Sequence, residues 1–496
     1  MNGHGESDRS VVPTKLPNKG GEPLAEVAEG RDLAKGNTSP QNALRTQGRA
    51  SVHSARERVR QAVKRDKGRP LTALFHHIAN IDALREAYYS LKRQAAPGID
   101  GETWEHYGGD LEAKLKDLVD RLKRGAYRAK PVRRTYIPKA DGRQRPLGVT
   151  ALEDKLVQLA TVEVLNVVYE EEFRGYSYGF RPKRGPHGAL DALAVGLERR
   201  TVRWVLDADL KAFFDSIDHE WMVTMIGYRI ADRRVVRLIQ KWLRAGVLEN
   251  GRVARMEVGT PQGGNISPLL ANIYLHYVLD EWADAWRKRI GGDVILVRYA
   301  DDFVMGFQHK ANAERFLADL RDRLAKYKLR LHPDKTRLIE FGRFAAANRE
   351  QRGDGQPETF DFLGLTHRCA KNGKGWFVLR RTTSRKRLHA KLQELKGEMK
   401  QRMHDPIPKT GAWLGAVLRG HFQYYGVPGN SNAMRFMRDQ VTRYWRHNLR
   451  RRSQRDRTTW TNMAALAERW LPPADPVHPH PYHRLRVITR GKSPVR

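Results

Sequence analysis

Two apolar segments with a pair of aspartates between them constrain the fold of this chain more than any other part of its sequence. The segments are Val294–Tyr299 and Phe303–Phe307, and Ala300-Asp-Asp302 separates them. The pattern predicts a β-hairpin with two adjacent carboxylates at an exposed tip. Carboxylates held this close raise each other's pKa, and a divalent cation such as Mg²⁺ would relieve the repulsion. A solvated acidic turn is the alternative for an Asp-Asp pair taken alone.

Another carboxylate, that of Asp209, ends an earlier candidate strand, Val202–Asp209. If the end of that strand lies beside the hairpin tip, three carboxylates meet there. Such a set can hold two Mg²⁺ ions that span the attacking and leaving oxygens of a reaction. Asp207 and Asp209 lie on the same face of the strand because side chains alternate along it, so the spacing leaves open which of the two takes part.

The chain carries a large excess of positive charge. Its 91 Lys and Arg against 56 Asp and Glu give a net charge of +35, and basic residues recur from Arg9 onward rather than in one tail. We therefore expect a polyanionic partner whose phosphates Lys and Arg neutralise, although a generally soluble surface would also be basic. The dense basic runs are Arg56–Arg69, Arg121–Arg145, Arg380–Lys400 and Arg443–Arg455.

Other classes of protein are disfavoured. No apolar run approaches the ~18–20 residues that span a bilayer, and the first residues lack the pattern of a secretory signal. The single cysteine, Cys369, excludes an internal disulfide framework and a zinc site built on paired Cys-x-x-Cys motifs. We expect a soluble, cytoplasmic protein without a membrane partner.

The pattern changes several times along the chain. Residues 1–55 are polar and Gly-rich without a sustained apolar period, which predicts a disordered extension. Helical spacing of apolar residues begins at Leu71, and residues 133–148 predict two short strands joined by an Asp141-Gly142 turn. Beyond about residue 375 the pattern becomes helical and basic, with one apolar stripe from Leu388 to Met403.

The order of short motifs resembles that of reverse transcriptases, and more closely that of group II intron reverse transcriptase/maturases, from about Leu71 to about Leu471. Any one motif is a weak signal, but the whole series in the expected order is a strong one. The motifs are Pro97-Gly-Ile-Asp100, Tyr136-Ile-Pro-Lys139, Arg145-Pro-Leu-Gly148, Tyr178-Gly-Phe-Arg181, Asp209-Leu-Lys-Ala-Phe-Phe-Asp215, Gly259-Thr-Pro-Gln-Gly-Gly264, Tyr299-Ala-Asp-Asp302, Leu331-His-Pro-Asp-Lys335 and Phe362-Leu-Gly364.

The resemblance implies roles for the acidic and aromatic residues. Asp209, Asp301 and Asp302 match the catalytic ligands of Mg²⁺, which leaves Asp207 as a structural or supporting residue. Phe214 resembles the ring that lies under the incoming sugar and leaves no room for a 2′-hydroxyl, so dNTPs should be preferred over rNTPs.

The resemblance also implies nucleotide contacts from basic and amide side chains. Lys139 and Arg145 resemble the pair that holds the triphosphate, where cations can neutralise charge on the leaving pyrophosphate. Gln262, in a Gly-rich loop, resembles a nucleotide-contacting residue, and Lys335 resembles a lysine that assists proton transfer to pyrophosphate. Outside their motifs, such residues in so basic a chain are more often surface charges.

The helical region resembles the thumb and the RNA-binding maturase region, which interleave aromatic residues with arginine. We expect the arginines, more than the tryptophans, to face RNA, while Trp445 and other aromatic residues can form the core of a helical bundle. The arginines are Arg446, Arg450, Arg451 and Arg452.

The implied fold is α+β, a right-hand polymerase. Fingers and palm occupy residues 60–370, a helical thumb and maturase region residues 375–471, and a tail residues 472–496. About 25 residues follow Leu471, so we expect the endonuclease-lacking type. His478 and His480 could suggest a metal site, but a Pro-rich surface tail is the preferred interpretation.

The implied function is an Mg²⁺-dependent, RNA-directed DNA polymerase that extends a DNA primer or target on an RNA template with dNTPs. It would also bind its intron RNA to assist splicing and mobility, as a bacterial protein associated with the nucleoid or a ribonucleoprotein. One alternative is an RNA-binding splicing factor without polymerase activity, which would be expected to lose acidic ligands. Another is a retron or defence-type reverse transcriptase, against which the basic helical region argues.

Overall fold

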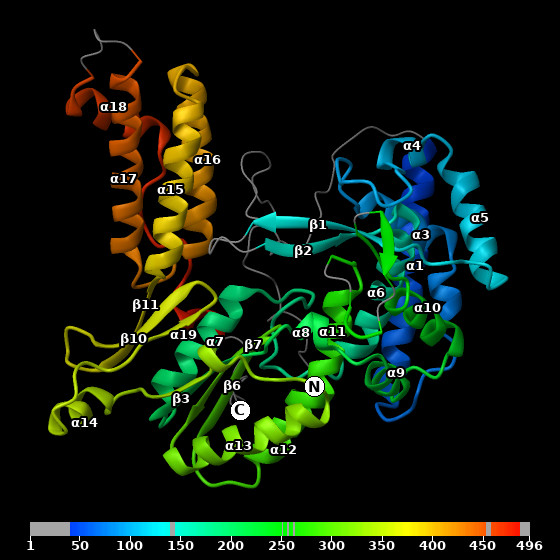
Figure 1. Ribbon diagram of the computed structural model, residues 1–496, viewed down its shortest axis with the longest axis horizontal. Coiled ribbons are helices and arrows are strands. Elements are labelled where there is room, and N and C mark those ends of the chain that lie inside the picture. Colours follow the sequence, from blue (N-terminus) through cyan, green and yellow to red (C-terminus); the bar gives the residue numbers. More distant parts are fainter. Residues whose placement is uncertain are drawn as a thin grey trace.

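The chain arranges its helices and strands in three groups (Figure 1). The computed structural model describes residues 40–138, 144–249, 251–254, 257–260, 263–452 and 458–486. Helices and a small sheet form one end of the molecule, a central sheet covered by helices forms the middle, and four long helices stand at the other end. Within these ranges no helix is both long and apolar enough to cross a membrane.

The central sheet is antiparallel, with strand order β6-β7-β3-β8. Its strands are β3 (Trp204–Asp209), β6 (Val294–Tyr299), β7 (Asp302–Phe307) and β8 (Arg337–Glu340). Both faces are buried, since Leu206 and Met305 belong to the large first core and Val205 and Val304 to a second core. Burial on both faces accounts for the nearly continuous apolar sequence of β6 and β7. The predicted hairpin of residues 294–307 is confirmed.

Six helices form the first group and pack around the first core. They are α1 (Pro40–Arg65), α2 (Phe75–Ile78), α3 (Ile81–Ser90), α4 (Trp104–Gly108), α5 (Leu111–Lys123) and α6 (Leu152–Tyr169). The prediction of disorder up to residue 55 is wrong for residues 40–55, because α1 packs against α3 and α6 through a narrow stripe that contains Val52, Val59 and Val63. Residues 1–39 lie outside the described part of the chain.

A small sheet with strand order β2-β1-β4-β5 stands beside these helices. Its strands are β1 (Val132–Pro138), β2 (Gln144–Val149), β4 (Val247–Glu249) and β5 (Arg252–Ala254). Strand β1 pairs antiparallel with β2 and parallel with β4. The two strands predicted within residues 133–148 are therefore confirmed, while the predicted Asp141-Gly142 turn lies outside the described residues.

Helices cover both faces of the central sheet. Ala189, Leu193 and Leu197 of α7 pack in the second core, and Phe316 and Leu320 of α13 pack in the first. Helices α9 and α10 lie instead beside the first group (Figure 1). The helices and turns between α6 and β9 are α7 (Pro186–Arg199), α8 (Phe213–Ser216), α9 (His219–Gly227), α10 (Arg233–Leu243), α11 (Ser267–Leu275), the π-helical turn η1 (His276–Asp280), α12 (Glu281–Arg287), α13 (Lys310–Lys326), the 3₁₀ turn η2 (Pro333–Lys335) and α14 (Ala345–Gln351).

A three-stranded sheet, with order β11-β10-β9, links the middle of the molecule to the long helices. Its strands are β9 (Phe360–Phe362), β10 (Leu365–Lys371) and β11 (Phe377–Thr383). The helical region therefore begins at Arg385 rather than at about residue 375. The sequence boundary was wrong because Phe377–Thr383 is a basic segment whose Leu379 nevertheless packs in the second core.

The four long helices enclose a core of their own. They are α15 (Arg385–Gln401), α16 (Ile407–Tyr425), α17 (Ser431–Arg450) and α18 (Trp460–Trp470). Most of the predicted stripe, from Leu388 to Met399, is buried in this third core, whereas Met403 follows the end of α15 and is partly exposed. Trp445 is also buried there, as the alternative interpretation of the aromatic residues expected.

The segment after Leu471 returns to the middle of the molecule. Residues 475–477 are on the surface, as the prediction of a surface tail expected, but the end of the segment packs against the protein. Helix α19 (Pro481–Arg486) packs on α7, and Leu485 is buried in the second core. The rings of His478 and His187 stack with centroids 3.7 Å apart, and Tyr482 Oη donates a hydrogen bond to Glu198 Oε2 at 2.5 Å. These contacts with α7 explain why a Pro-rich segment lies against the protein.

Candidate active site

Three aspartates meet at one end of the central sheet. Asp209 is the last residue of β3 and lies directly opposite Asp302, the first residue of β7. Asp301 precedes Asp302 in the turn between β6 and β7, and Ala300 in the same turn has a left-handed backbone with φ 56°. The antiparallel register therefore brings together three carboxylates that are far apart in the sequence.

The electrostatics of this end of the sheet reflect the crowding of like charges. Burial, followed by the charge of Asp209, raises the pKa of Asp301 to about 6. Burial and the charges of Asp207, Asp209 and Asp301 hold the pKa of Asp302 well above its usual range. Carboxylates that are this costly to ionise together favour a bound cation.

Nearby cations partly balance the cluster. Lys335 Nζ, from η2, forms an ion pair with the carboxylate of Asp209. Arg337 Nη2 lies 3.6 Å from Asp207 Oδ2, although burial still raises the pKa of Asp207 to about 6. Asp207 lies opposite Val304, two residues further from the turn than Asp209 and on the same face of the sheet.

The donor set fits a hard cation. Asp209, Asp301 and Asp302 offer oxygen atoms only, and Mg²⁺ typically binds one or two protein carboxylates together with substrate phosphates and water. In the described ranges, no three His, Cys, Asp or Glu side chains are grouped closely enough to form a metal site on their own.

The residues predicted to bind a nucleotide lie around this cluster where they are described. Arg145, on β2, is close enough to Asp301 for its charge to lower the pKa of that carboxyl. Phe214 is partly exposed, whereas the neighbouring Phe213 is buried in the first core with its ring centroid 5.6 Å from that of Phe214. Lys139 and Gln262 lie outside the described residues.

The Gly-rich loop connects these parts. Thr260 N donates a hydrogen bond to Phe214 O at 2.8 Å, so one side of the loop is attached beside Phe214. Gly263 has φ 112°, and a Cβ there would lie 2.3 Å from Gly148 O of β2. Only glycine permits this approach, which brings the loop between β2 and Phe214.

Comparisons with known proteins agree with the motif order. The family model described as reverse transcriptase (RNA-dependent DNA polymerase) matches residues 137–367. The group II intron-encoded protein LtrA of Lactococcus lactis subsp. cremoris is 39% identical over 224 residues, which cover 44% of this chain and 37% of LtrA. Protein YkfC of Escherichia coli (strain K12) is 36% identical over 283 residues, which cover 50% of this chain and 74% of YkfC.

This chain belongs to the group II intron reverse transcriptase/maturase family. Its similarity extends to eukaryotic sequences, since an uncharacterised 91 kDa protein in the cob intron of Schizosaccharomyces pombe is 38% identical over 207 residues, 42% of this chain and 25% of that protein. The match to LtrA spans well under half of that relative's length.

A buried network that the motifs did not indicate supports the turn of this reverse transcriptase/maturase. Arg298, fully buried, donates from Nε to Asp280 Oδ1 at 2.8 Å and from Nη2 to Asp280 Oδ2 at 2.5 Å. Its Nη1 donates to Asn272 Oδ1 at 3.0 Å and to Ala300 O at 2.9 Å. Asn272 Nδ2 donates to Gly179 O at 2.7 Å, and a Cβ on Gly179 would lie 2.4 Å from Ala300 N. The one available sequence signal was an arginine inside an apolar strand.

The four arginines predicted to bind RNA divide into two pairs. Arg450 and Arg451 are exposed at the end of α17. Arg446 is partly buried, with Nε donating to Thr458 O at 3.1 Å and its guanidinium 4.3 Å from the Trp460 ring centroid. Arg452 Nη2 donates to Asp405 O at 2.7 Å. The second pair therefore connects parts of the chain to one another.

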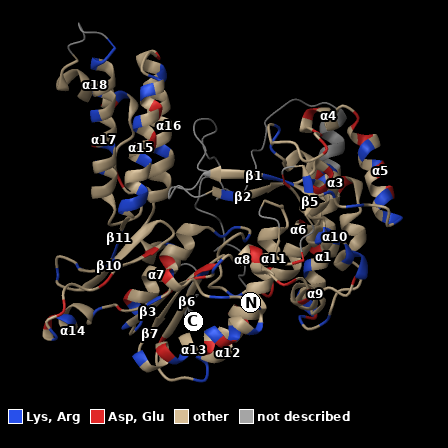
Figure 2. Ribbon diagram, viewed as in Figure 1, with Lys and Arg blue, Asp and Glu red and all other residues tan. Residues whose placement is uncertain are grey.

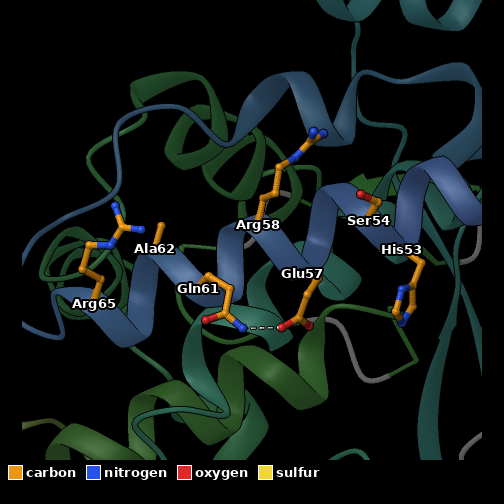
Figure 3. Close-up of a pocket in the computed structure, with 7 residues that line it drawn as sticks. All are labelled: His53, Ser54, Glu57, Arg58, Gln61, Ala62 and Arg65. Atoms are coloured by element: carbon orange, nitrogen blue, oxygen red, sulfur yellow. Dashed lines mark hydrogen bonds between the residues drawn. The ribbon is translucent and has the colours of Figure 1, made fainter.

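A surface pocket lies along α1 (Figure 3). Gln61 Nε2 donates a hydrogen bond to Glu57 Oε1 at 2.7 Å at its edge. The pocket is lined by His53, Ser54, Glu57, Arg58, Gln61, Ala62 and Arg65. All of its lining residues belong to one helix, and it includes no residue of the candidate active site.

Proposed function

We propose that this chain is the RNA-directed DNA polymerase of a group II intron and that it also binds the intron RNA to assist splicing and mobility. The observation that carries the proposal is the meeting of Asp209, Asp301 and Asp302 at one end of the central sheet. Membership of the family supports it, as does the net charge of +35.

In the proposed arrangement the central sheet is the palm of a right-hand polymerase. Helices α1–α6 and the small sheet of β1, β2, β4 and β5 serve as fingers, and α15–α18 as the thumb and maturase region (Figure 1). The proposed extents are residues 40–370 for fingers and palm, since α1 begins at Pro40, and 385–471 for the helical region. The RNA template and the DNA primer would lie between them.

Asp209, Asp301 and Asp302 would hold Mg²⁺, which when bound stabilises charge on the reacting oxygens. Lys335, in contact with Asp209, would interact with the triphosphate and supply a proton to the leaving pyrophosphate. Arg145, together with Lys139, would neutralise the charge of the triphosphate.

Phe214 would select the sugar of the incoming nucleotide. Phe214 is partly exposed, and its backbone oxygen is bonded to the Gly-rich loop that contains Gln262, so a nucleotide held by that loop would meet the ring. An aromatic ring offers no hydrogen bond to a 2′-hydroxyl, and this favours dNTPs over rNTPs. Gln262 would contact the same nucleotide.

The helical region would bind the intron RNA. Lys and Arg are spread over α15, α16 and α17 (Figure 2). Arg450 and Arg451 are exposed and would contact phosphates, while Arg446 and Arg452 would hold neighbouring segments in place for that contact.

Primer extension on an RNA template tests the polymerase proposal. The purified full chain, with Mg²⁺ and dNTPs, should extend a DNA primer, and Asp301→Asn should abolish extension because it removes a carboxylate charge. Asp322→Asn is the matched control, since Asp322 is an exposed aspartate on α13. Inactivity of the unmodified protein would contradict the proposal and favour a splicing factor without polymerase activity.

A further inference from the structure

We propose that the outer face of the β10–β11 hairpin binds an unpaired segment of RNA. We call this surface the hairpin face. It consists of the side chains that alternate away from the second core, with Trp376 at the tip, and it contains no residue of the candidate active site. Its strand residues are Thr366, Arg368, Ala370, Val378, Arg380 and Thr382.

Two arginines of the hairpin face lie directly opposite each other. Arg368 of β10 pairs with Arg380 of β11, and both side chains are exposed. Like charges in such a cross-strand pair destabilise a sheet. Throughout the described ranges, neither arginine forms an ion pair with a carboxylate, nor does Lys371 or Lys374 near the tip. A phosphate bound between the arginines would relieve their repulsion.

The tip presents an exposed aromatic ring on a hydrogen-bonded turn. Trp376 is 70% exposed, the most exposed large apolar side chain among the described residues. Asn372 fixes the turn, because its Oδ1 accepts hydrogen bonds from Lys374 N at 2.9 Å and Trp376 N at 3.0 Å, and Asn372 N donates to Trp376 O at 2.9 Å. An accessible ring on a fixed backbone can stack on a base without the turn first being ordered.

Small side chains separate the arginines from the tryptophan. Ala370 and Val378 form a cross-strand pair and are partly exposed, so only short side chains project from the sheet between the arginines and the tryptophan. Arg380 and Trp376 are four residues apart, or about 13 Å along a strand. The hairpin face therefore offers a short path with phosphate-binding groups at one end and a stacking surface at the other.

This combination favours an unpaired RNA segment over a duplex. The bases of a duplex are stacked on one another and cannot lie on an indole ring, whereas RNA loops and single strands expose both bases and phosphates. RNA is also the partner in the proposed function, on which this choice of nucleic acid rests.

Photo-crosslinking tests the location of the contact. The probe is a 30-nucleotide oligo(U) that contains 4-thiouridine, irradiated with the full chain and then digested with trypsin. We expect cross-linked nucleotide on Trp376, within the peptide Gly375–Arg380, and we expect unlabelled oligo(U) to compete. Absence of a cross-link on this peptide would overturn the proposal, and equal competition by oligo(dU) or by an RNA duplex would overturn the choice of unpaired RNA.

Affinity measurements separate the two parts of the hairpin face. Trp376→Ala should weaken oligo(U) binding by roughly 5- to 150-fold with little change in salt dependence, and Trp376→Phe should restore most of the loss. Arg368→Gln with Arg380→Gln should reduce the magnitude of the negative slope of log K against log salt by about 1.4. The matched control is Arg315→Gln with Arg321→Gln, which removes the same charge from the exposed side of α13. Equal effects of both double variants would contradict a specific contact.

Failure of this proposal can be distinguished from failure of the polymerase proposal. Asp301→Asn should abolish primer extension yet leave the cross-link to Trp376 intact, because the hairpin face does not include the carboxylates. Loss of the cross-link in Asp301→Asn would show that the RNA reaches Trp376 only through the active site, which overturns an independent RNA contact.

Discussion

At the scale of single residues, Arg298 shows how a buried charge can fix the turn that carries Asp301. Its guanidinium and the carboxylate of Asp280 are both fully buried, and the same guanidinium bonds the carbonyl of Ala300 beside Asp301. Removing one member of a buried ion pair leaves an uncompensated charge, which costs about 3–5 kcal/mol.

Asp280→Asn should therefore lower the free energy of unfolding by about 3 kcal/mol and reduce primer extension as well. Urea unfolding and primer extension measure the two effects. Asp319→Asn is the control, because Asp319 and Arg315 form a largely exposed pair 3.9 Å apart on α13, although Asp319 also accepts a hydrogen bond from Trp286. Unchanged stability of Asp280→Asn would contradict the supporting role of the pair.

Phe214 is the residue on which sugar selection depends in the proposed function. Phe214→Ala should raise the incorporation of rNTPs relative to dNTPs by roughly 10-fold or more, since the space for a 2′-hydroxyl opens. Single-nucleotide incorporation kinetics with both substrates measure the ratio. Phe344→Ala, at an exposed phenylalanine, should leave the ratio unchanged, and the same result for Phe214→Ala would exclude its role.

The sequence predicted some of these residues and not others for a physical reason. Asp209 is the last residue of one strand and Asp302 the first residue of another, and the apolar pattern of both strands is visible in the sequence. Their meeting therefore followed from one assumption about strand pairing. Arg298 acts through Asp280 and Asn272, which belong to a helical segment elsewhere in the chain. Contacts between separate elements leave no local pattern in the sequence, and the arginine within an apolar strand was the one sequence signal for this network.

At the scale of elements, the C-terminal segment is joined to α7 by groups that respond to pH. Burial, and then the neighbouring His478, Arg484 and Arg381, lower the pKa of His187 to about 4, against a hydrogen bond between its Nε2 and Tyr424 O at 2.8 Å. The carboxylate of Asp191 lies 3.2 Å from Arg484 and faces the same cluster. Burial also lowers the pKa of His478, so docking favours the neutral form of both imidazoles.

Docking of this segment should weaken as the pH falls. The pKa of His187 is about 4 when docked and rises towards the ordinary value of 6.5 when release removes His478 and Arg484, so the released state binds more protons between these values. The free energy that favours docking is at its full value above pH 6.5, and it falls by up to about 3 kcal/mol as the pH falls towards 4. Equal stability of docking at pH 7.5 and 5.0 would contradict this sign.

Hydrogen exchange at Val477 and His478, corrected for the intrinsic effect of pH, measures the docking, because both amides donate to Gly426 O. His187→Gln should make protection less dependent on pH, since it removes one of the two titrating rings. A pH dependence that is unchanged in this variant would assign the effect to another group.

The elements themselves differed in how well the sequence predicted them. The hairpin of residues 294–307 was predicted because burial on both faces leaves a continuous apolar pattern. Helix α1 and strand β11 were missed because each buries only a narrow stripe beneath a basic surface, so the polar residues dominate the pattern. The contact of α19 with α7 joins segments almost 300 residues apart, and composition alone suggested a tail.

At the scale of the whole molecule, the net charge of +35 is spread over all three groups of elements (Figure 2). Binding to nucleic acid should therefore depend strongly on salt, through several surfaces rather than one. Of the four arginines from Arg446 to Arg452, the exposed Arg450 and Arg451 should act directly on phosphates, because Arg446 and Arg452 are engaged within the chain.

Arg450→Gln with Arg451→Gln should lower the slope of log K against log salt for a structured RNA by about 1.8 and leave thermal stability nearly unchanged. Arg446→Gln should instead lower the melting temperature, since it removes the hydrogen bond to Thr458 and the contact with Trp460. Filter binding at several salt concentrations and calorimetry distinguish the two. The reverse pattern would contradict the division of the arginines.

The central claim is that Asp209, Asp301 and Asp302 act together as a magnesium site. A structure of the full chain with an RNA template, a DNA primer, a dNTP and Mn²⁺, with anomalous scattering recorded at the manganese edge, tests it most directly. We predict ions bound by the three carboxylates at about 2.1 Å and Lys335 turned from Asp209 towards the triphosphate. Manganese bound elsewhere, with Asp209 still paired to Lys335, would contradict the account.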